Sequence, residues 1–257
     1  MTKRAMGNLV NRYRSVLKKC HLINTFGSLA VAAILVMGVT DGEAFSNAVG
    51  YNVTSTTTPG TTVSVTDTSE NAVASGIKAE TSATYSVPST ITRAEATAIG
   101  KQSALSLGVF AQSSSGNRLT VNLAPLDISS TAVTENGTSR SVGIYSDVNS
   151  SVSAHGGTIV SSAHSKNGIG EAFGAMSQNN SSVTLGADTI VASSESSKHL
   201  SDPRSVGIYF SDNSTFNVTS NRIRVDVSAT HNGDVFSRKV RGCPACFLIL
   251  KGVVISS

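Results

Sequence analysis

Apolar and polar residues alternate in short runs along much of the chain. The clearest case is segment 206–227, where alternate positions within three runs are apolar; they are Val206, Ile208, Phe216, Val218, Ile223, Val225 and Val227. Polar turn-forming residues separate these runs, at 212–214 and at 219–221. A period of two, bounded by turn residues, predicts short β-strands with one buried face.

The strand pattern belongs to a repeat. Ser-Val-Gly-Ile-Tyr-Ser-Asp at 141–147 returns as Ser-Val-Gly-Ile-Tyr-Phe-Ser-Asp at 205–212. Looser copies extend the series on glycines whose successive numbers differ by 32, 35, 31 and 33, namely Gly76, Gly108, Gly143, Gly174 and Gly207. Units of this length, with two or three strands each, are typical of solenoids in which every unit packs on its neighbours. We therefore expect an all-β fold, a right-handed parallel β-helix of about five imperfect repeats.

The composition suits stacked strands better than a large aromatic core. Aromatic residues make up 5% of the chain, Trp is absent, and charged residues make up 14%. Ser, Thr, Asn and Gly take their place, which favours side-chain ladders but also fits a low-complexity stalk. A glycosylated stalk stays open as an alternative because seven Asn-x-Ser/Thr triplets occur; they begin at Asn52, Asn136, Asn149, Asn179, Asn180, Asn213 and Asn217.

The positive charge lies at the two ends of the chain. Six Lys and Arg residues and no acid occur in 1–26, and four more basic residues follow Asp234 without an acid. Subtracting these ten charges from the net charge of +4 leaves 27–237 with a charge of −6. An acidic body disfavours polyanions such as nucleic acid, which bind through clustered Lys and Arg.

Residues 1–44 have the pattern of an export signal. A basic segment, 1–26, precedes an apolar run of twelve residues at 28–39. About 20 apolar residues are needed to span a bilayer, so the run matches the shorter hydrophobic region of a signal peptide. The small residues Gly42 and Ala44 predict cleavage after Ala44. An uncleaved membrane anchor is the alternative.

Three further regions follow the leader. Residues 45–70 are rich in Ser and Thr, contain one expected strand at 61–66, and form either a cap or a linker. The β-helix repeats occupy 71–236, with loops expected at 93–105, 163–170 and 193–204, the last two on one side of the solenoid. Residues 237–257 differ abruptly in charge and apolar content, which indicates a truncation, a frameshift or a C-terminal cap.

Candidate reactive residues do not form a recognisable site. Cys243 and Cys246 make a Cys-x-x-Cys pair, but neither a second ligand pair nor the strand and helix of a redox motif accompanies it. The histidines after the leader are expected in exposed loops; they are His155, His164, His199 and His231. The Gly-x-Ser-x-Gly elbow of many hydrolases is missing.

Four aspartates, Asp147, Asp188, Asp212 and Asp226, could line one face of a β-helix. Catalysis by acids needs two carboxyl groups that converge. We interpret Asp147 and Asp212 as equivalent turn residues, because Asp satisfies local backbone groups in turns. Gly156 and Gly157 mark a turn without the repeat that binds calcium. We therefore expect no catalytic residue, cofactor or metal.

The leader resembles the extended signal peptides of large Gram-negative autotransporters. The similarity rests on Asn-Arg-Tyr-Arg-Ser-Val-Leu-Lys-Lys at 11–19, followed by the apolar run. Leader and repeats together resemble the N-terminal part of an autotransporter passenger, without the β-barrel that carries such passengers outward. Passengers of this family are commonly right-handed parallel β-helices. Residues 94–100 are also similar to the shorter head repeats of trimeric autotransporter adhesins.

The resemblance implies an exported protein at the cell surface or outside the cell, or in the periplasm if the barrel is missing from the gene. The implied role is adhesion in virulence, without catalysis. Expected partners are a host-surface or matrix ligand, or a neighbouring bacterial cell, and the inner-membrane secretion machinery through the leader. A β-helical lyase or glycosidase and a disordered glycosylated stalk are the alternatives.

Overall fold

The computed structural model describes residues 47–56, 59–114, 117–186, 189–196, 203–211, 213–219, 224–231 and 234–241. Across these ranges the chain forms sixteen β-strands and no helix, and accordingly no helix there is long and apolar enough to cross a membrane. The predicted leader, its cleavage site after Ala44, and the pair Cys243 and Cys246 lie outside the described residues.

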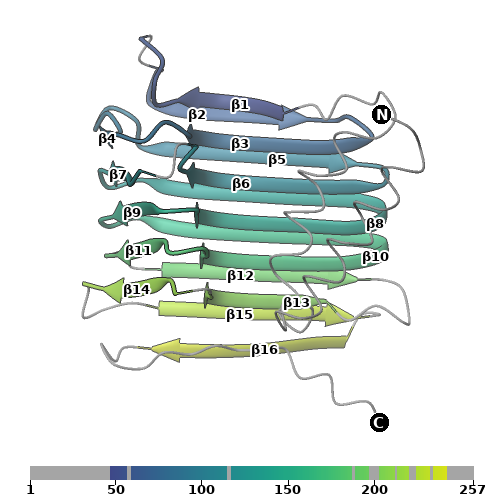
Figure 1. The fold of residues 1–257 in the computed structure, drawn as a ribbon. Helices are drawn as coiled ribbons and strands as arrows, with labels where there is room; N and C mark the ends of the chain where they lie inside the picture. The colour runs from purple at the N-terminus through teal and green to yellow at the C-terminus, as the bar shows by residue number, and fades with distance from the viewer. Residues whose placement is uncertain are drawn as a thin grey trace, which may run out of the picture. The chain divides into compact units, whose positions relative to one another are not determined.

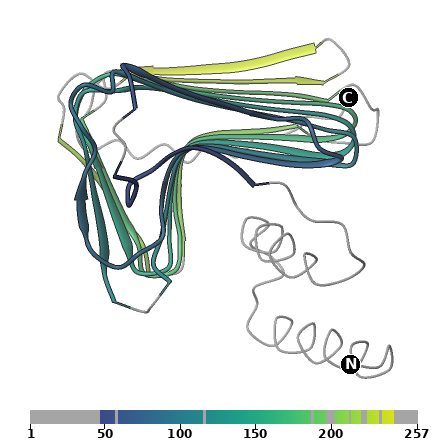
Figure 2. The same cartoon turned by 90° about the horizontal axis from the view of Figure 1, so that it is seen from above.

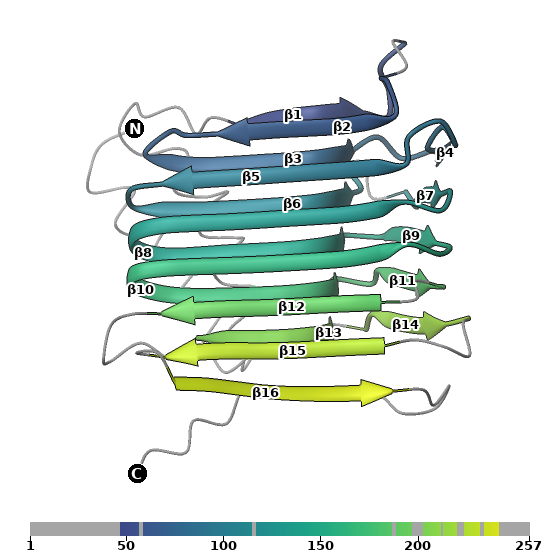
Figure 3. The ribbon, with the colours of Figure 1, turned by 180° about the vertical axis from the view of Figure 1, so that it is seen from behind.

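The strands stack into a parallel β-solenoid with three sides (Figures 1 and 3). The first side contains β2 (Thr62–Asp67), β5 (Arg93–Gly100), residues 127–134 of β8 (Asp127–Asp147), residues 158–165 of β10 (Thr158–Ser177), β12 (Thr189–Ser196) and β15 (Arg224–His231). The second side contains β1 (Asn47–Asn52), β3 (Asn71–Ala79), β6 (Ser103–Gln112), the remainders of β8 and β10, and β13 (Arg204–Phe210). The third side contains β4 (Thr84–Ser86), β7 (Leu119–Leu123), β9 (Ser150–Ala154), β11 (Ser182–Leu185) and β14 (Thr215–Val218).

The pairing register has the period that the glycines predict. On the second side one inward column runs through successive coils in the order Ile77, Val109, Ile144, Ala175 and Ile208. Each of these residues stands one position after a repeat glycine, so the column has the same spacing as the glycines. Each coil therefore places an aliphatic side chain at the same position around the solenoid axis. This confirms the predicted all-β parallel β-helix and its aliphatic columns.

One further coil precedes the predicted series. Strand β1 pairs with β3, with Tyr51 opposite Ile77, a shorter step along the sequence than in the later coils. Strand β2 coincides with the strand expected at 61–66 and pairs with β5. The region 45–70, expected to be a cap or a linker, thus contributes two strands to the stack. A Cβ on Gly50 would lie 2.9 Å from the carbonyl oxygen of Gly76, so Gly50 extends the glycine column.

The first side ends with a reversal of strand direction. Strand β16 (Asp234–Arg241) pairs antiparallel with β15, with Ser237 opposite Ser228. Every other strand pair of the described residues is parallel. The change of sequence character after residue 236 therefore coincides with a change of pairing, and the tail beyond Arg241 lies outside the described residues.

The strands of the second side bend, and each coil traces a two-armed outline when viewed down the stack (Figure 2). Ser141 is buried and hydrogen-bonded to Ser130 of the first side, while Ile144 lies in the apolar core. Residues three apart face inward on both sides of Gly143, so the strand alternation shifts there. Val142 and Ile144, which the sequence pattern placed inward, are both buried.

Glycine is required at the bend because the opposite layer comes close. A Cβ on Gly143 would overlap Cγ2 of Ile159 and would lie 2.5 Å from the carbonyl oxygen of Gly174. The same relation recurs one coil later, where Gly174 faces Ile190. The repeat glycine is therefore a packing position, set by a β-branched residue of the first side.

The two arms of the coil have different interiors. Bulky aliphatic residues fill the arm between the second and third sides, including Leu119, Val121 and Val152. Small residues fill the arm between the first and second sides, where alanines cluster with Ala96 and Ala132. Buried serines bridge its layers: Ser161 donates to the carbonyl oxygen of Ser141 over 2.8 Å. Hydrogen bonding allows these hydroxyls to be buried at little cost.

Two segments predicted as loops are strands. Residues 93–100 form β5, which lies between β2 and β8 and buries alternate alanines, so pairing on both edges overrides alanine's helix preference. Residues 163–170 lie within the continuous strand β10, where Asn167 and Gly168 pair with Asn136 and Gly137. The third predicted loop, 193–204, begins inside β12 and ends at β13, with 197–202 outside the described residues.

Candidate functional surfaces

The outer face of the third side carries ten uncharged polar residues in two columns. Alternate residues of β4, β7, β9, β11 and β14 point outward, as their burial pattern shows. The register aligns them as Thr84, Thr120, Ser151, Ser182 and Thr215 in one column and Ser86, Asn122, Ser153, Thr184 and Asn217 in the other. We call this surface the hydroxyl–amide face.

Hydrogen bonds link neighbouring coils across the hydroxyl–amide face. The hydroxyl of Ser182 donates to that of Ser151 over 2.8 Å. At one rim, Nη2 of the exposed Arg118 donates to Oγ of Ser182 over 3.2 Å. At the other rim, Nε2 of the exposed His155 lies 3.0 Å from Oγ of Ser153. The face is thus a regular array of hydroxyl and amide groups with a nitrogen donor or acceptor at each edge.

The sequence contains a signal for this face that the repeat analysis did not use. The outward residues stand eight and ten positions after the repeat glycine in four coils, as Ser151 and Ser153 stand after Gly143. In the coil of Gly108 the offsets are twelve and fourteen. Aligning the repeats on the glycines would therefore have shown a column of polar residues at each position.

The first side presents a different, charged outer face. Arg93 pairs with Glu95 at 2.6 Å, and Arg224 pairs with Asp226 at 2.5 Å. The hydrogen bond to Asp226, and then its charge, raise the pKa of Arg224 above its ordinary value. Serine and threonine columns lie between these pairs, including Thr131 opposite Ser162. Opposite charges therefore neutralise one another within this face.

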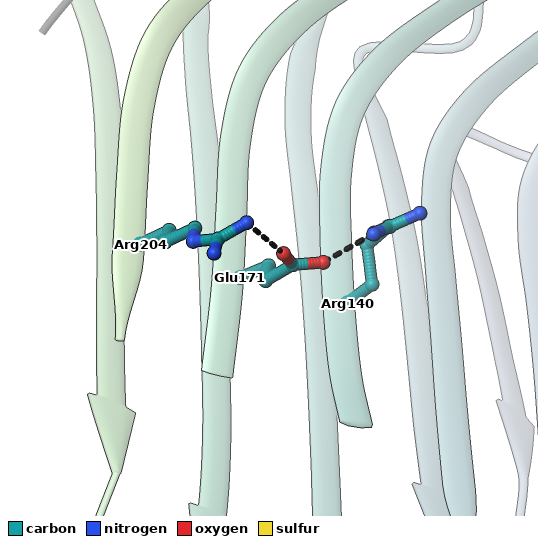
Figure 4. A network of polar contacts seen from close by, with 3 residues as sticks. All are labelled: Arg140, Glu171 and Arg204. Atoms are coloured by element: carbon teal, nitrogen blue, oxygen red, sulfur yellow. Dashed lines mark hydrogen bonds and ion pairs between the residues drawn. The ribbon is translucent and has the colours of Figure 1, made fainter. Parts of the chain in front are cut away.

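A buried ionic ladder crosses three coils of the second side (Figure 4). Glu171 of β10 accepts from Nε of Arg140 in β8 over 2.9 Å, and Arg140 Nη2 bonds to the same carboxylate oxygen. On the opposite side, Nη1 of Arg204 in β13 lies 3.5 Å from Oε1 of Glu171. The side chains of Arg140 and Glu171 are 3% and 6% exposed. A buried carboxylate between two guanidinium groups fixes the register of these strands, since a slip would separate the charges.

Aromatic side chains accompany the ladder. The ring of Phe173 lies 5.9 Å from the guanidinium carbon of Arg140 and contacts Tyr209 edge-on. Phe110 stacks on Tyr145 at 5.7 Å between ring centres. Cation–π and ring contacts of this kind add to the cohesion between coils. In the sequence, all three ladder residues stand three positions before a repeat glycine, which was a detectable signal.

The predicted aspartates do not converge on one site within the described residues. Asp147 accepts hydrogen bonds from its neighbour's backbone at Val148 and from Asn179 and Gln112 in adjacent coils. Asp147 is the last residue of β8 and satisfies the backbone of the turn that follows, which is the local role expected of it. Glu171 does not converge with Asp147, because it lies level with Arg140, and Arg140 precedes Asp147 by seven residues along β8. Asp226 lies on the first side, and Asp188 and Asp212 lie outside the described residues.

The position of Asp147 can be followed into the next two coils. Ser177 pairs with Phe210, and the backbone N–H of Ser211 donates to the carbonyl oxygen of Ser177, so Gln178, the neighbour of Asp147 in the next coil, lies level with Ser211. The predicted equivalence of Asp147 and Asp212 depends on Asp212, which lies outside the described residues.

The histidines do not share a location. His155 is exposed in the turn after β9, as expected, whereas His164 lies within strand β10 and pairs with Glu195 at 3.1 Å. His231 is the last residue of β15, but its side chain is not among those described. His199 lies outside the described residues. Gly156 and Gly157 form a turn with positive φ. In the described ranges, no three His, Cys, Asp or Glu side chains form a group that could hold a metal ion.

No protein family model matches this chain, and neither a curated protein nor a solved structure shows significant similarity to it.

Proposed function

We propose that this chain is an exported passenger-type protein that acts by adhesion, at the cell surface or outside the cell, and without a catalytic step. The β-solenoid supports the proposal because stacked coils offer long, regular outer faces suited to binding an extended partner. The leader-like sequence of residues 1–44 supports export. Adhesion is argued from these features, since a fold by itself does not name a function.

The observation that carries the proposal is the hydroxyl–amide face. Ten outward positions on five coils all hold Ser, Thr or Asn. They form two columns, and each coil contributes one residue to each column. Each such hydrogen bond contributes only about 0.5–1.5 kcal/mol net. Repetition is therefore what gives such a face useful affinity, through many simultaneous weak contacts. This is the chemistry of attachment to an extended surface.

The test has two parts, export and adhesion. The full chain is expressed in a Gram-negative host, and the N-terminus of the exported protein is sequenced; we expect it to begin at Phe45. Beads coated with the exported protein are then applied to epithelial cells and to immobilised matrix proteins and glycans. Retention above that of beads coated with an unrelated β-rich protein supports adhesion. An unprocessed protein in the cytoplasm, or beads that bind nothing, would refute the proposal.

A further inference from the structure

The hydroxyl–amide face has the dimensions of a strip. Adjacent strands lie about 4.8 Å apart, so the five strands of the third side span about 19 Å along the stack, and the two columns lie about 7 Å apart. A stable protein–protein interface needs about 800 Å² from each partner. The strip is far smaller than that, so it suits a single linear chain better than a folded protein.

The charge of the surroundings selects the kind of chain. The ten residues of the strip carry no charge, while residues 27–237 carry a charge of −6. An anionic polymer would be repelled by the acidic body and would find no cluster of Lys and Arg on the strip. A neutral chain meets neither obstacle, and hydroxyl and amide groups both donate and accept hydrogen bonds.

The rims of the strip add directional contacts. Arg118 lies against Ser182 at one edge and His155 against Ser153 at the other. Both side chains are exposed beside the strip. A guanidinium group and an imidazole at the two edges would hold the hydroxyls of a chain that runs between them along the stack.

From this geometry we propose that the hydroxyl–amide face binds a neutral linear polysaccharide, with the sugar chain aligned along the solenoid axis. This inference rests on the proposed adhesive function and specifies its surface and its ligand class. Binding grows with chain length up to the length of the strip, about 19 Å, because each coil that the sugar chain reaches contributes another pair of weak hydrogen bonds. Oligosaccharides shorter than the strip therefore bind more weakly than those that span it.

The test compares two matched double variants of the full exported chain. Ser153→Lys with Thr184→Lys places two lysines in adjacent coils of the hydroxyl–amide face. Thr131→Lys with Ser162→Lys places the same charges in adjacent coils of the first side. Binding is measured by electrophoresis through gels containing mannan, amylose or hydroxyethyl cellulose, with alginate as the anionic comparison. Circular dichroism melts confirm that both variants are folded.

We expect retardation by at least one neutral polymer, weakened about tenfold by the hydroxyl–amide variant, since several of the hydrogen bonds are lost, and unchanged in the first-side variant. Equal binding by both variants would overturn the face assignment and leave adhesion standing. Retardation by alginate alone would overturn the ligand class. Attachment to cells or matrix proteins without binding to any polysaccharide would overturn this inference but not the proposed function, whereas no attachment at all would overturn both.

Discussion

Replacing the repeat glycine Gly143 with alanine should be among the most damaging small changes to this fold. The added Cβ would overlap Cγ2 of Ile159 and lie 2.5 Å from the carbonyl oxygen of Gly174. Overpacking typically costs about 1–3 kcal/mol, and here the carbonyl is held by strand pairing and cannot move aside. Restricting the unfolded chain returns only about 0.4–1 kcal/mol. With an overpacking cost at the upper end of its range, we therefore expect a net destabilisation of about 2 kcal/mol.

Thermal unfolding followed by far-UV circular dichroism measures this loss. For a domain of this size, about 2 kcal/mol corresponds to a fall in Tm of about 4–8 °C. Gly207→Ala is the informative comparison, because among the described residues the atoms nearest to its added Cβ belong to the side chains of Val225 and Val227. Side chains can adjust, so we expect a loss of about 1 kcal/mol there.

Gly60→Ala is the neutral control, since no atom of the described residues, apart from its chain neighbours, lies within 4 Å of its added Cβ. It should leave Tm unchanged or raise it slightly, through the unfolded chain. The reasoning is refuted if Gly143→Ala melts within about 2 °C of the parent protein, a shift worth less than about 1 kcal/mol. It is also refuted if Gly207→Ala is the more damaging of the two, because the backbone contact would then have no effect.

Three other substitutions test separate features. Glu171→Gln leaves two arginines without their shared carboxylate, and we expect a loss of about 2–3 kcal/mol in chemical denaturation; an unchanged midpoint would show that the ladder contributes nothing. Val148 has a φ of 45° where the next coil has Asn179, so Val148→Asn should raise stability by about 1 kcal/mol, and a lower Tm would contradict the strain argument. Arg93→Ala breaks an exposed ion pair and should change stability by less than about 1 kcal/mol, so a larger loss in urea unfolding would contradict its exposure.

The coil architecture could be predicted from the sequence because one position per repeat is under strict steric control. The glycine at each bend is closely approached by its neighbours, so its spacing indicated the register of five successive coils directly. The first coil was not predicted from the sequence, because its step from Tyr51 to Ile77 is shorter than the others and places Gly50 outside the regular period. The strand at 93–100 was not predicted, because its alanines favour a helix locally. It forms β5 only through pairing with strands distant in the sequence.

The surfaces were harder to predict than the register. Arg140, Glu171 and Arg204 lie in three successive coils, so their contact depends on coils that must first be aligned. Prediction of the outer columns of the third side also requires the coil of Gly108 to be aligned. In that coil the outward residues stand four positions further from the repeat glycine than in the other coils. These features follow from the register, which single motifs do not contain.

The reversed strand β16 has a consequence for how such a chain can change length over evolution. A segment one coil long, such as the one that begins at Thr158 and ends just before Thr189, returns the backbone to the same place one strand further along the stack. Duplication of such a segment within the gene would insert a coil between existing ones without disturbing either neighbour. Addition at the end of the first side is different, because β16 already occupies the free edge of β15 in the antiparallel direction. Internal duplication is therefore the open route to a longer protein.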